Sequence, residues 1–383
     1  TNMKKIINYS LIVLCAVAIS ATSCEPSHEK SEALTILESK FKATNTDFVE
    51  KTVKPTYRAL ADNDKKLVEQ LSALKTDADV VKACDLWKVA RQDWEWSEAF
   101  LFGPAGDYGI DPHTDTWPFD RTQFDKYMAK FHPATDESDA AIIDDAIANG
   151  QNLTGFHAVE YLIFRDGNAR KLADMTADEI YFAKGAAQDL YLSSLKLVSA
   201  WGGEVSADEQ KLLDEVEFES KDYGADFKNA GNAGSSYSTI VLATRQIIAG
   251  ANDIIGEVRD SKIGSPATGE DVNYIESPHA RNSIQDFYDN IMSCKHTLYG
   301  ALTVSGTEPL ANSLIGICLD VKEFEAAAEN VKTNMEAALK AIANMKKPFV
   351  QNYTHQSAKD AMTALDGLEK SLNALDELIA SYE

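Results

Sequence analysis

Residues 77–102 read DADVVKACDLWKVARQDWEWSEAFLF, and this stretch decides the fold class of the chain. Trp87, Trp94 and Leu101 recur at intervals of seven, which places them on one face of a helix. A glycine–proline pair follows and is a strong helix stop. Long segments with the same helical period lie on both sides, and none shows the alternation of a half-buried strand. The sequence therefore predicts an all-α protein.

Local signals give the expected bounds of the helices. Thr176-x-x-Glu179 and Ser206-x-x-Glu209 are capping boxes, and Ser277 followed by a proline fits the start of another helix. Glycine and proline make 103–120 an ordered loop, and 261–275 is expected to be a linker. Besides a short helix around His157, the expected helices are 34–61, 63–74, 77–102, 121–131, 136–149, 177–201, 207–219, 237–260, 278–304, 309–344 and 356–382.

The length of 383 residues favours two domains rather than one core. The Gly-, Asn- and Ser-rich stretch 221–236 is the best boundary. We expect two helical-bundle domains packed against each other, the second resembling a four-helix bundle. The expected division is a signal peptide at 1–24, a tether at 25–33, a first domain at 34–225 and a second at 230–383.

Charge excludes one class of partner. The chain has 37 Lys and Arg against 60 Asp and Glu, a formal net charge of −23. So acidic a protein repels nucleic acid and anionic lipid surfaces, and it tolerates or attracts cations. We therefore expect no nucleic-acid partner.

The beginning of the chain has the pattern of an export signal. Two lysines precede the apolar run 6–19, small residues follow, and then comes Cys24. This is typical of a bacterial lipoprotein signal, in which Cys24 is acylated; an ordinary secretory signal is the alternative. Three cysteines remain, an odd number that excludes a complete disulfide framework. Buried thiols are expected at Cys84, Cys294 and Cys318, with a Cys294–Cys318 bond as the alternative.

The stretch 155–164, GFHAVEYLIF, carries the strongest functional signal. His157 and Glu160 are three residues apart, so on a helix they point the same way. Their neighbours are apolar nearly all round, and burying an unpaired carboxylate is costly without a compensating charge or metal. The pair is therefore a candidate metal site. A core histidine hydrogen-bonded to a glutamate is the structural alternative.

The helix at 77–102 adds charged candidates. Arg91 and Glu98 share the tryptophan stripe, and Glu95 lies at its edge. Charged residues on such a stripe are expected to be paired or to coordinate an ion. Arg91 therefore either forms an ion pair with Glu95 or Glu98, or it orients a carboxylate while Glu98 completes a site with His157.

The loop after this helix holds several further potential ligands. Its acidic and histidine side chains fit either a metal or the caps of turns, and we favour Asp115 among them. The set is Asp107, Asp111, His113 and Asp115.

Three separate blocks resemble the imelysin family. The third block holds Glu276-Ser277, Arg281-Asn282-Ser283, Asp286-Phe287 and Asn290. The first two are the run from Trp87 to Pro118, with its Arg91, Trp94-Glu95 and Ser97-Glu98, and the GxHxxE pattern of Gly155, His157 and Glu160.

The resemblance implies two helical bundles with the GxHxxE site near the cleft between them, in an exported protein. By position, His157 and Glu160 are the metal-binding pair, Glu98 is a ligand or its neighbour with Arg91, and Glu276 approaches from the second domain. The family is named for peptidase activity, and its relatives include a periplasmic iron-uptake component. The expected location is the cell envelope, where the protein would be a lipoprotein of the outer membrane.

We therefore expect a lipid-anchored protein that binds a divalent or trivalent metal and assists iron acquisition. Its expected partner is an iron-uptake transporter. Histidine and carboxylates suit iron, zinc or manganese alike, and the resemblance favours iron, with zinc as the next candidate. A metallopeptidase is the alternative, although the chain has no HExxH pattern. A structural or adhesion lipoprotein with a buried His–Glu pair is the third reading.

Overall fold

The structure is a computed structural model that describes residues 32–133, 139–149 and 153–383. It is all-α apart from one small hairpin, as predicted, and Cys24 lies outside the described residues. The hairpin pairs β1 (Phe164–Arg165) with β2 (Asn168–Ala169). The first half contains α1 (Glu32–Asp47), η1 (Phe48–Val53), α2 (Lys54–Leu71), α3 (Asp77–Glu95), η2 (Glu98–Phe100), α4 (Pro104–Asp107), α5 (Ile110–Thr114), α6 (Arg121–Met128), α7 (Asp139–Asn149), α8 (Gly155–Ile163), η4 (Leu172–Asp174), α9 (Ala177–Ala200), α10 (Ala207–Glu215) and α11 (Tyr223–Lys228). The second half contains α12 (Ile240–Glu257), η5 (Val258–Ile263), α13 (Gly264–Thr268), α14 (Ser283–Tyr299), α15 (Leu314–Asp320), α16 (Glu325–Ala343), α17 (Phe349–Asn352) and α18 (Gln356–Ala380).

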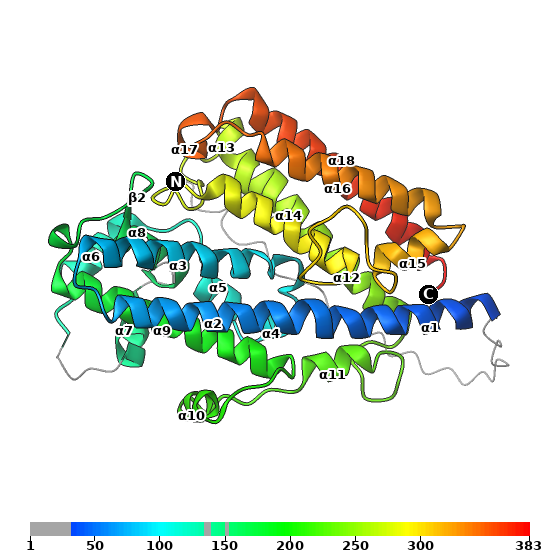
Figure 1. Ribbon diagram of the computed structural model, residues 1–383, viewed down its shortest axis with the longest axis horizontal. Helices are drawn as coiled ribbons and strands as arrows, with labels where there is room; N and C mark the ends of the chain where they lie inside the picture. Colours follow the sequence, from blue (N-terminus) through cyan, green and yellow to red (C-terminus); the bar gives the residue numbers. More distant parts are fainter. Residues whose placement is uncertain (1–31, 134–138, 150–152) are drawn as a thin grey trace, which may run out of the picture.

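Two groups of long helices lie one above the other (Figure 1). In one group, α2 packs against α3 and α9, and α8 packs on α9. In the other, α12, α14, α16 and α18 pack as a bundle. The groups meet where α12 and α14 lie against η2 and α3, and where α1 lies against α12. A single hydrophobic cluster of buried residues runs through both groups, so the division into two domains stays a prediction.

The tryptophan stripe of α3 is buried as predicted. Trp87 and Trp94 are fully buried and pack against Phe156 of α8. The predicted capping boxes at Thr176 and Ser206 are both present, each with its glutamate accepting from the cap backbone. These local signals survive folding because they satisfy free N–H groups within one helical turn.

Several expected bounds were wrong because tertiary contacts override local signals. The helix does not break near residue 62: α2 continues to Leu71, and its buried Asp64 accepts a hydrogen bond from Ser194 of α9. The expected helix 309–344 is two helices, α15 and α16. Ser277 does not start α14 but lies buried in the preceding loop with a φ of 46°.

Short elements also occupy two segments predicted as loop or linker. The π-helical turn η5 continues α12 into the segment 261–275, and α13 follows it. The segment 103–120 contains α4 and α5. Within the described residues the three cysteines are free and buried, so the Cys294–Cys318 alternative is wrong. None of the described helices is long and apolar enough to cross a membrane.

The contact between α12 and η2 depends on a glycine. A Cβ atom at Gly250 would lie 2.2 Å from the carbonyl oxygen of Ala99. Gly256, in the same helix, would meet only the end of the Glu369 side chain, at 3.6 Å. We therefore expect Gly250→Ala to lower the free energy of unfolding by about 1–3 kcal/mol through overpacking. Gly256→Ala is the matched control and should raise it by about 0.5–1 kcal/mol. Urea denaturation of both variants measures the difference, and equal effects would contradict the assigned close approach.

Candidate metal centre

Helix α8 presents His157 and Glu160 on one buried face, as predicted. The Nδ1 atom of His157 lies 3.1 Å from Oε2 of Glu160, and both side chains are almost completely buried. The other carboxylate oxygen, Oε1, accepts the backbone N–H groups of His279 and Ala280, both at 2.8 Å. Glu160 thus fixes the imidazole and ties α8 to the loop before α14. Both of its oxygens are engaged in doing so.

A glycine lets α8 approach the end of α5. Gly155 begins α8 with a φ of 75°, and a Cβ there would lie 2.3 Å from the carbonyl oxygen of Thr114. Only a glycine fits this backbone conformation at this distance without displacing a neighbour. The next residue after Thr114 is Asp115, whose carboxylate therefore reaches His157.

Asp115 faces the second nitrogen of His157. Its Oδ1 lies 3.0 Å from Nε2, but Nε2 makes no hydrogen bond with acceptable geometry to any described residue. The Trp94 indole N–H donates to Oδ2 at 2.9 Å. Burial alone would raise the pKa of Asp115, but Arg91 and His157 outweigh it and hold that pKa well below its usual range. Burial would lower the pKa of His157, and the contacts with Asp115 and Glu160 instead raise it to about 8.

Arg91 of α3 is the fully buried cation at the middle of this cluster. It forms ion pairs with Asp115 and Glu95, and with Oε1 of Glu276 at 2.9 Å. Asp286 of α14 lies slightly farther away, at 3.8 Å. The predicted Arg91–Glu95 pair is therefore confirmed. Arg91 holds together carboxylates from four separate segments of the chain.

A second buried cation comes from the π-helical turn. The Nζ atom of Lys262 donates to Oε1 of Glu276 at 2.9 Å and lies 3.9 Å from both Glu95 and Glu257. Sequence reasoning missed Lys262 because it assigned the residue to a linker. Nothing in the local sequence places this lysine beside α3, since only the continuation of α12 through η5 brings it there.

Carboxylates outnumber cations around a small cavity of about 240 Å³ beside this cluster. Burial and neighbouring carboxylates raise the pKa of Glu98, and they raise the pKa of Asp111 to about 7. Lys262 is the cationic side chain among the described residues that line it. We call this space the carboxylate cavity; its charged lining residues are Glu98, Asp111, Asp115, Glu257, Glu276 and Lys262.

Three potential ligand atoms converge beside this cavity, two of them from residues that line it. One atom each from His157, Asp115 and Glu276 lie within 4.8 Å of one another. Nε2 of His157 and Oε2 of Glu276 are buried and have no hydrogen-bond partner among the described residues. Other buried atoms of the described residues share this property, including Nδ1 of His296, so the convergence of the three ligand atoms is what singles out this point. Imidazole with carboxylates also suits iron, manganese or zinc, so the residues present fit a metal cation.

The structure brings most of the predicted site residues together. His157, Glu160, Asp115 and Glu276 form one cluster, which we call the His157 group. Glu98 instead groups with Asp115 and Glu95, with ligand atoms within 4.8 Å of one another. His113 instead pairs with Asp189. Asp107 is also elsewhere, accepting from Tyr223.

Two polar residues of α14 belong to the network and were given no role from the sequence. Asp286 neighbours Arg91, and the Asn290 amide donates to Glu95. They are four residues apart and therefore share one face of a helix that is buried along most of its length. Polar residues recurring on one side of an otherwise buried helix are the signal that could have identified them.

The family model described as imelysin matches residues 53–381, which is most of the chain. The chain belongs to the imelysin family. The resemblance carried by the three sequence blocks is therefore confirmed. His157 and Glu160 of the GxHxxE pattern are the two residues that contact each other on the buried face of α8.

Relatives of this imelysin include proteins named for regulation by iron. The chain is 29% identical over 246 residues to iron-regulated protein A of Synechococcus elongatus, and the match covers 63% of this chain and 60% of that protein. A solved structure from Parabacteroides distasonis, provisionally named an iron-regulated protein A precursor, has a TM-score of 0.76 at 24% identity and covers 92% of this chain and 97% of its own. An imelysin-like protein from Psychrobacter arcticum has a TM-score of 0.61 at 13% identity, with coverage of 90% and 94%. At these identities the two structures show the shared all-α fold.

The close approach at Gly155 gives a test of how the motif positions the site. Gly155→Ala adds a Cβ against Thr114 in a conformation that already disfavours it, and we expect a loss of about 2–4 kcal/mol in unfolding free energy. Gly269→Ala is the matched control, because Gly269 has a φ of 81° and nothing within 4 Å of the added atom. Urea denaturation followed by tryptophan fluorescence should show the larger loss for Gly155→Ala. Equal losses would mean that the approach of α8 to Thr114 is not required.

A second buried histidine shows how a purely structural histidine differs from His157. His296 of α14 packs edge-on against Trp96, and burial together with Lys295 lowers its pKa to about 4. An unfolded histidine titrates near 6.5, so the unfolded chain gains a proton first as pH falls. His296 therefore costs stability below about pH 6.5, by about 2 kcal/mol at pH 5.

We expect His296→Gln to reduce the loss of stability between pH 7 and pH 5 by about that amount, about 2 kcal/mol. Guanidinium denaturation at several pH values measures it, with the exposed His132 replaced by glutamine as control. A wild-type slope in His296→Gln would contradict a neutral, buried imidazole.

Proposed function

We propose that this imelysin binds an iron cation at His157, Asp115 and Glu276. The observation that carries the proposal is the convergence of these three side chains, each of which places one potential ligand atom within 4.8 Å of the other two. Iron is favoured because the relatives from Synechococcus elongatus and Parabacteroides distasonis are named as iron-regulated proteins.

Glu160 acts by positioning the ligand nitrogen. In the neutral imidazole, a hydrogen bond from Nδ1–H of His157 to Glu160 leaves the Nε2 lone pair for a metal. Because the contacts with Asp115 and Glu160 raise the pKa of His157 to about 8, a binding metal must displace the proton on Nε2. The backbone N–H groups of His279 and Ala280 hold Glu160 in place from the other side. The motif then supplies one ligand and one residue that orients it.

Arg91 and Lys262 limit the negative charge that the cation meets. Both contact Oε1 of Glu276, which leaves Oε2 for a ligand role. Glu98 lies near Asp115 and holds its proton more firmly than an ordinary glutamate, because burial raises its pKa. A cation that enters the carboxylate cavity would replace such protons as the balancing positive charge.

We further propose that the protein is exported and anchored by a lipid at Cys24, so that it collects iron at the cell envelope for a transporter. Support comes from the signal pattern before Cys24 and from the word precursor in the name of the Parabacteroides distasonis relative. An acylated cysteine at the mature N-terminus, detected by mass spectrometry of protein expressed with its signal, tests the anchor. A Cys24→Ala variant with unchanged membrane association would overturn it.

Metal binding is tested by calorimetry and elemental analysis with Fe²⁺ under anaerobic conditions, Fe³⁺, Mn²⁺ and Zn²⁺. We expect saturable binding that His157→Ala or Glu276→Gln abolishes and that Glu160→Gln weakens by about 10–100-fold. Asp289→Asn is the matched control, because Asp289 is a buried carboxylate hydrogen-bonded to Trp96 and Gln285 outside the metal groups.

Wild-type protein that takes up none of these metals would overturn the proposal. So would a His157→Ala variant with a lowered melting temperature and wild-type metal binding, since that result assigns the His157 group a structural role. Calorimetry and thermal melting on the same samples separate the two outcomes.

A further inference from the structure

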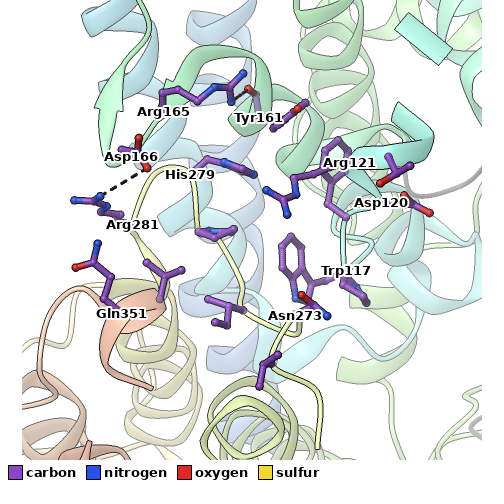
Figure 2. Close-up of a pocket in the computed structure, with 17 residues that line it drawn as sticks. Trp117, Asp120, Arg121, Tyr161, Arg165, Asp166, Asn273, His279, Arg281 and Gln351 are labelled. Atoms are coloured by element: carbon purple, nitrogen blue, oxygen red, sulfur yellow. Dashed lines mark hydrogen bonds and ion pairs between the residues drawn. The ribbon is translucent and has the colours of Figure 1, made fainter. Parts of the chain in front are cut away.

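A larger cavity, of about 870 Å³, lies next to the candidate metal centre and has a different chemistry (Figure 2). Its walls come from the start of α6, the end of α8 with the hairpin, the loop before α14, and α17. We call it the arginine cavity, because three arginines line it: Arg121, Arg165 and Arg281.

This cavity differs from the rest of the described molecule in that two of its arginines form no ion pair with a described residue. The chain has eight arginines, all of them within the described residues. Among the described residues, Arg121 and Arg165 have no carboxylate within 4 Å, and both line the arginine cavity. The chain has 60 acidic residues, and yet these two guanidinium groups face one cavity without an ion-pair partner among the described residues. The arginines with a carboxylate partner are Arg58, Arg91, Arg170, Arg245, Arg259 and Arg281.

The two unpaired guanidinium groups are held in different ways. Arg165 donates to the carbonyl oxygens of Tyr161 and Phe164 and lies over the Tyr161 ring, 4.7 Å from its centroid. Its position is therefore fixed in advance, with N–H groups left over for a ligand. Arg121 points across the cavity toward His279 (Figure 2). The two groups approach the same space from α6 and from β1.

The acidic residues that line the cavity balance only part of the arginine charge. Asp120 uses Oδ1 to cap α6 by accepting from the N–H of Gln123. Asp166 lies 3.8 Å from Arg281, on the opposite side from Arg121, and its side chain is 89% exposed. Three arginines against two carboxylates leave the lining of the arginine cavity with a net positive charge.

Aromatic and apolar side chains make up the rest of the walls. Tyr161 and Trp117 contribute ring surfaces, and Ile275 and Pro278 come from the loop before α14. Trp117 also packs against His157, with ring centroids 4.4 Å apart and the rings tilted by 56°, and it lines the carboxylate cavity as well. One tryptophan therefore stands between the arginine cavity and the candidate metal centre.

We propose that the arginine cavity binds an organic polycarboxylate, an anion of the class that chelates ferric iron. Each guanidinium can take one carboxylate through two parallel hydrogen bonds, and two guanidinium groups select a ligand with at least two carboxylates. The volume falls within the range of about 300–1,000 Å³ typical of small-molecule sites, and the apolar walls suit the carbon frame of such a ligand.

The anion site itself is independent of the metal site. The delivery of iron as a chelate rests on the proposed function, because it requires the His157 group to bind the metal. The positively charged arginine cavity would then hold the anionic chelator, and the carboxylates of the neighbouring cavity would attract the iron cation. Trp117 lines both cavities.

The experiment measures calorimetric binding of metal-free citrate, tricarballylate and inorganic phosphate at fixed ionic strength, and of ferric citrate. We expect saturable binding of both tricarboxylates, weakened about tenfold by either Arg121→Gln or Arg165→Gln and abolished by the double variant. Arg121→Lys/Arg165→Lys should bind more weakly than wild type, because lysine keeps the charge and loses the planar fork. The control, Lys65→Gln/Lys82→Gln, removes the same charge from two exposed positions and should bind as wild type does.

Wild-type protein that binds neither tricarboxylate overturns the proposal, as does binding that the double arginine variant leaves unchanged. Phosphate binding as tight as citrate binding also overturns it, since the site would then take any anion. His157→Ala separates the two proposals. Metal-free citrate binding should persist in this variant while ferric citrate loses any extra affinity. If wild-type protein binds citrate and takes up no metal, the proposed function fails and the anion site stands.

Discussion

The buried guanidinium of Arg91 is the constraint on which the centre of the molecule depends. A charge without water must be neutralised by the protein, and removing one partner of a buried pair costs about 3–5 kcal/mol. Its partners Glu95, Asp115, Glu276 and Asp286 come from α3, the end of α5, the loop before α14 and α14. Satisfying one side chain therefore fixes four segments relative to one another. The two groups of helices meet at this point.

Neutralising Arg91 brings in more negative charge than Arg91 can balance. Lys262 neutralises part of this excess negative charge through its ion pair with Glu276. The remainder appears as carboxyl groups that hold protons, with the pKa of Asp286 raised to about 7 by burial and by Glu276 despite the opposing effect of Arg91. Protons therefore supply the balancing positive charge, and a bound cation could take their place. Arg121 and Arg165 have no carboxylate within 4 Å among the described residues and line the adjoining cavity, so negative and positive charge are concentrated in separate places.

The sequence predicts the parts of this arrangement that depend on one helix. The buried face shared by His157 and Glu160, the stripe of Trp87 and Trp94, and the Arg91–Glu95 pair all follow from spacing within a helix. The position of Lys262 does not, because it depends on a π-helical turn in a segment that reads as a linker. Nor can spacing say which carboxylate faces Nε2 of the histidine, since Asp115 and Glu276 are far from His157 in the chain. The family blocks named both residues but assigned them no contact.

The GxHxxE pattern has a separate physical reason at each of its positions. The glycine permits a close approach that a Cβ would prevent, and so sets Asp115 against the imidazole. The glutamate has two oxygens, and it uses one for Nδ1 of His157 and the other for two backbone N–H groups of the loop that follows Glu276. One carboxylate thereby aligns the histidine and anchors the segment that carries another site carboxylate. An aspartate would be one methylene too short to span both contacts from α8, and a glutamine would offer an N–H₂ group where an acceptor is needed. Nε2 of the histidine is then the side-chain atom that the motif directs toward the carboxylates, 3.0 Å from Oδ1 of Asp115.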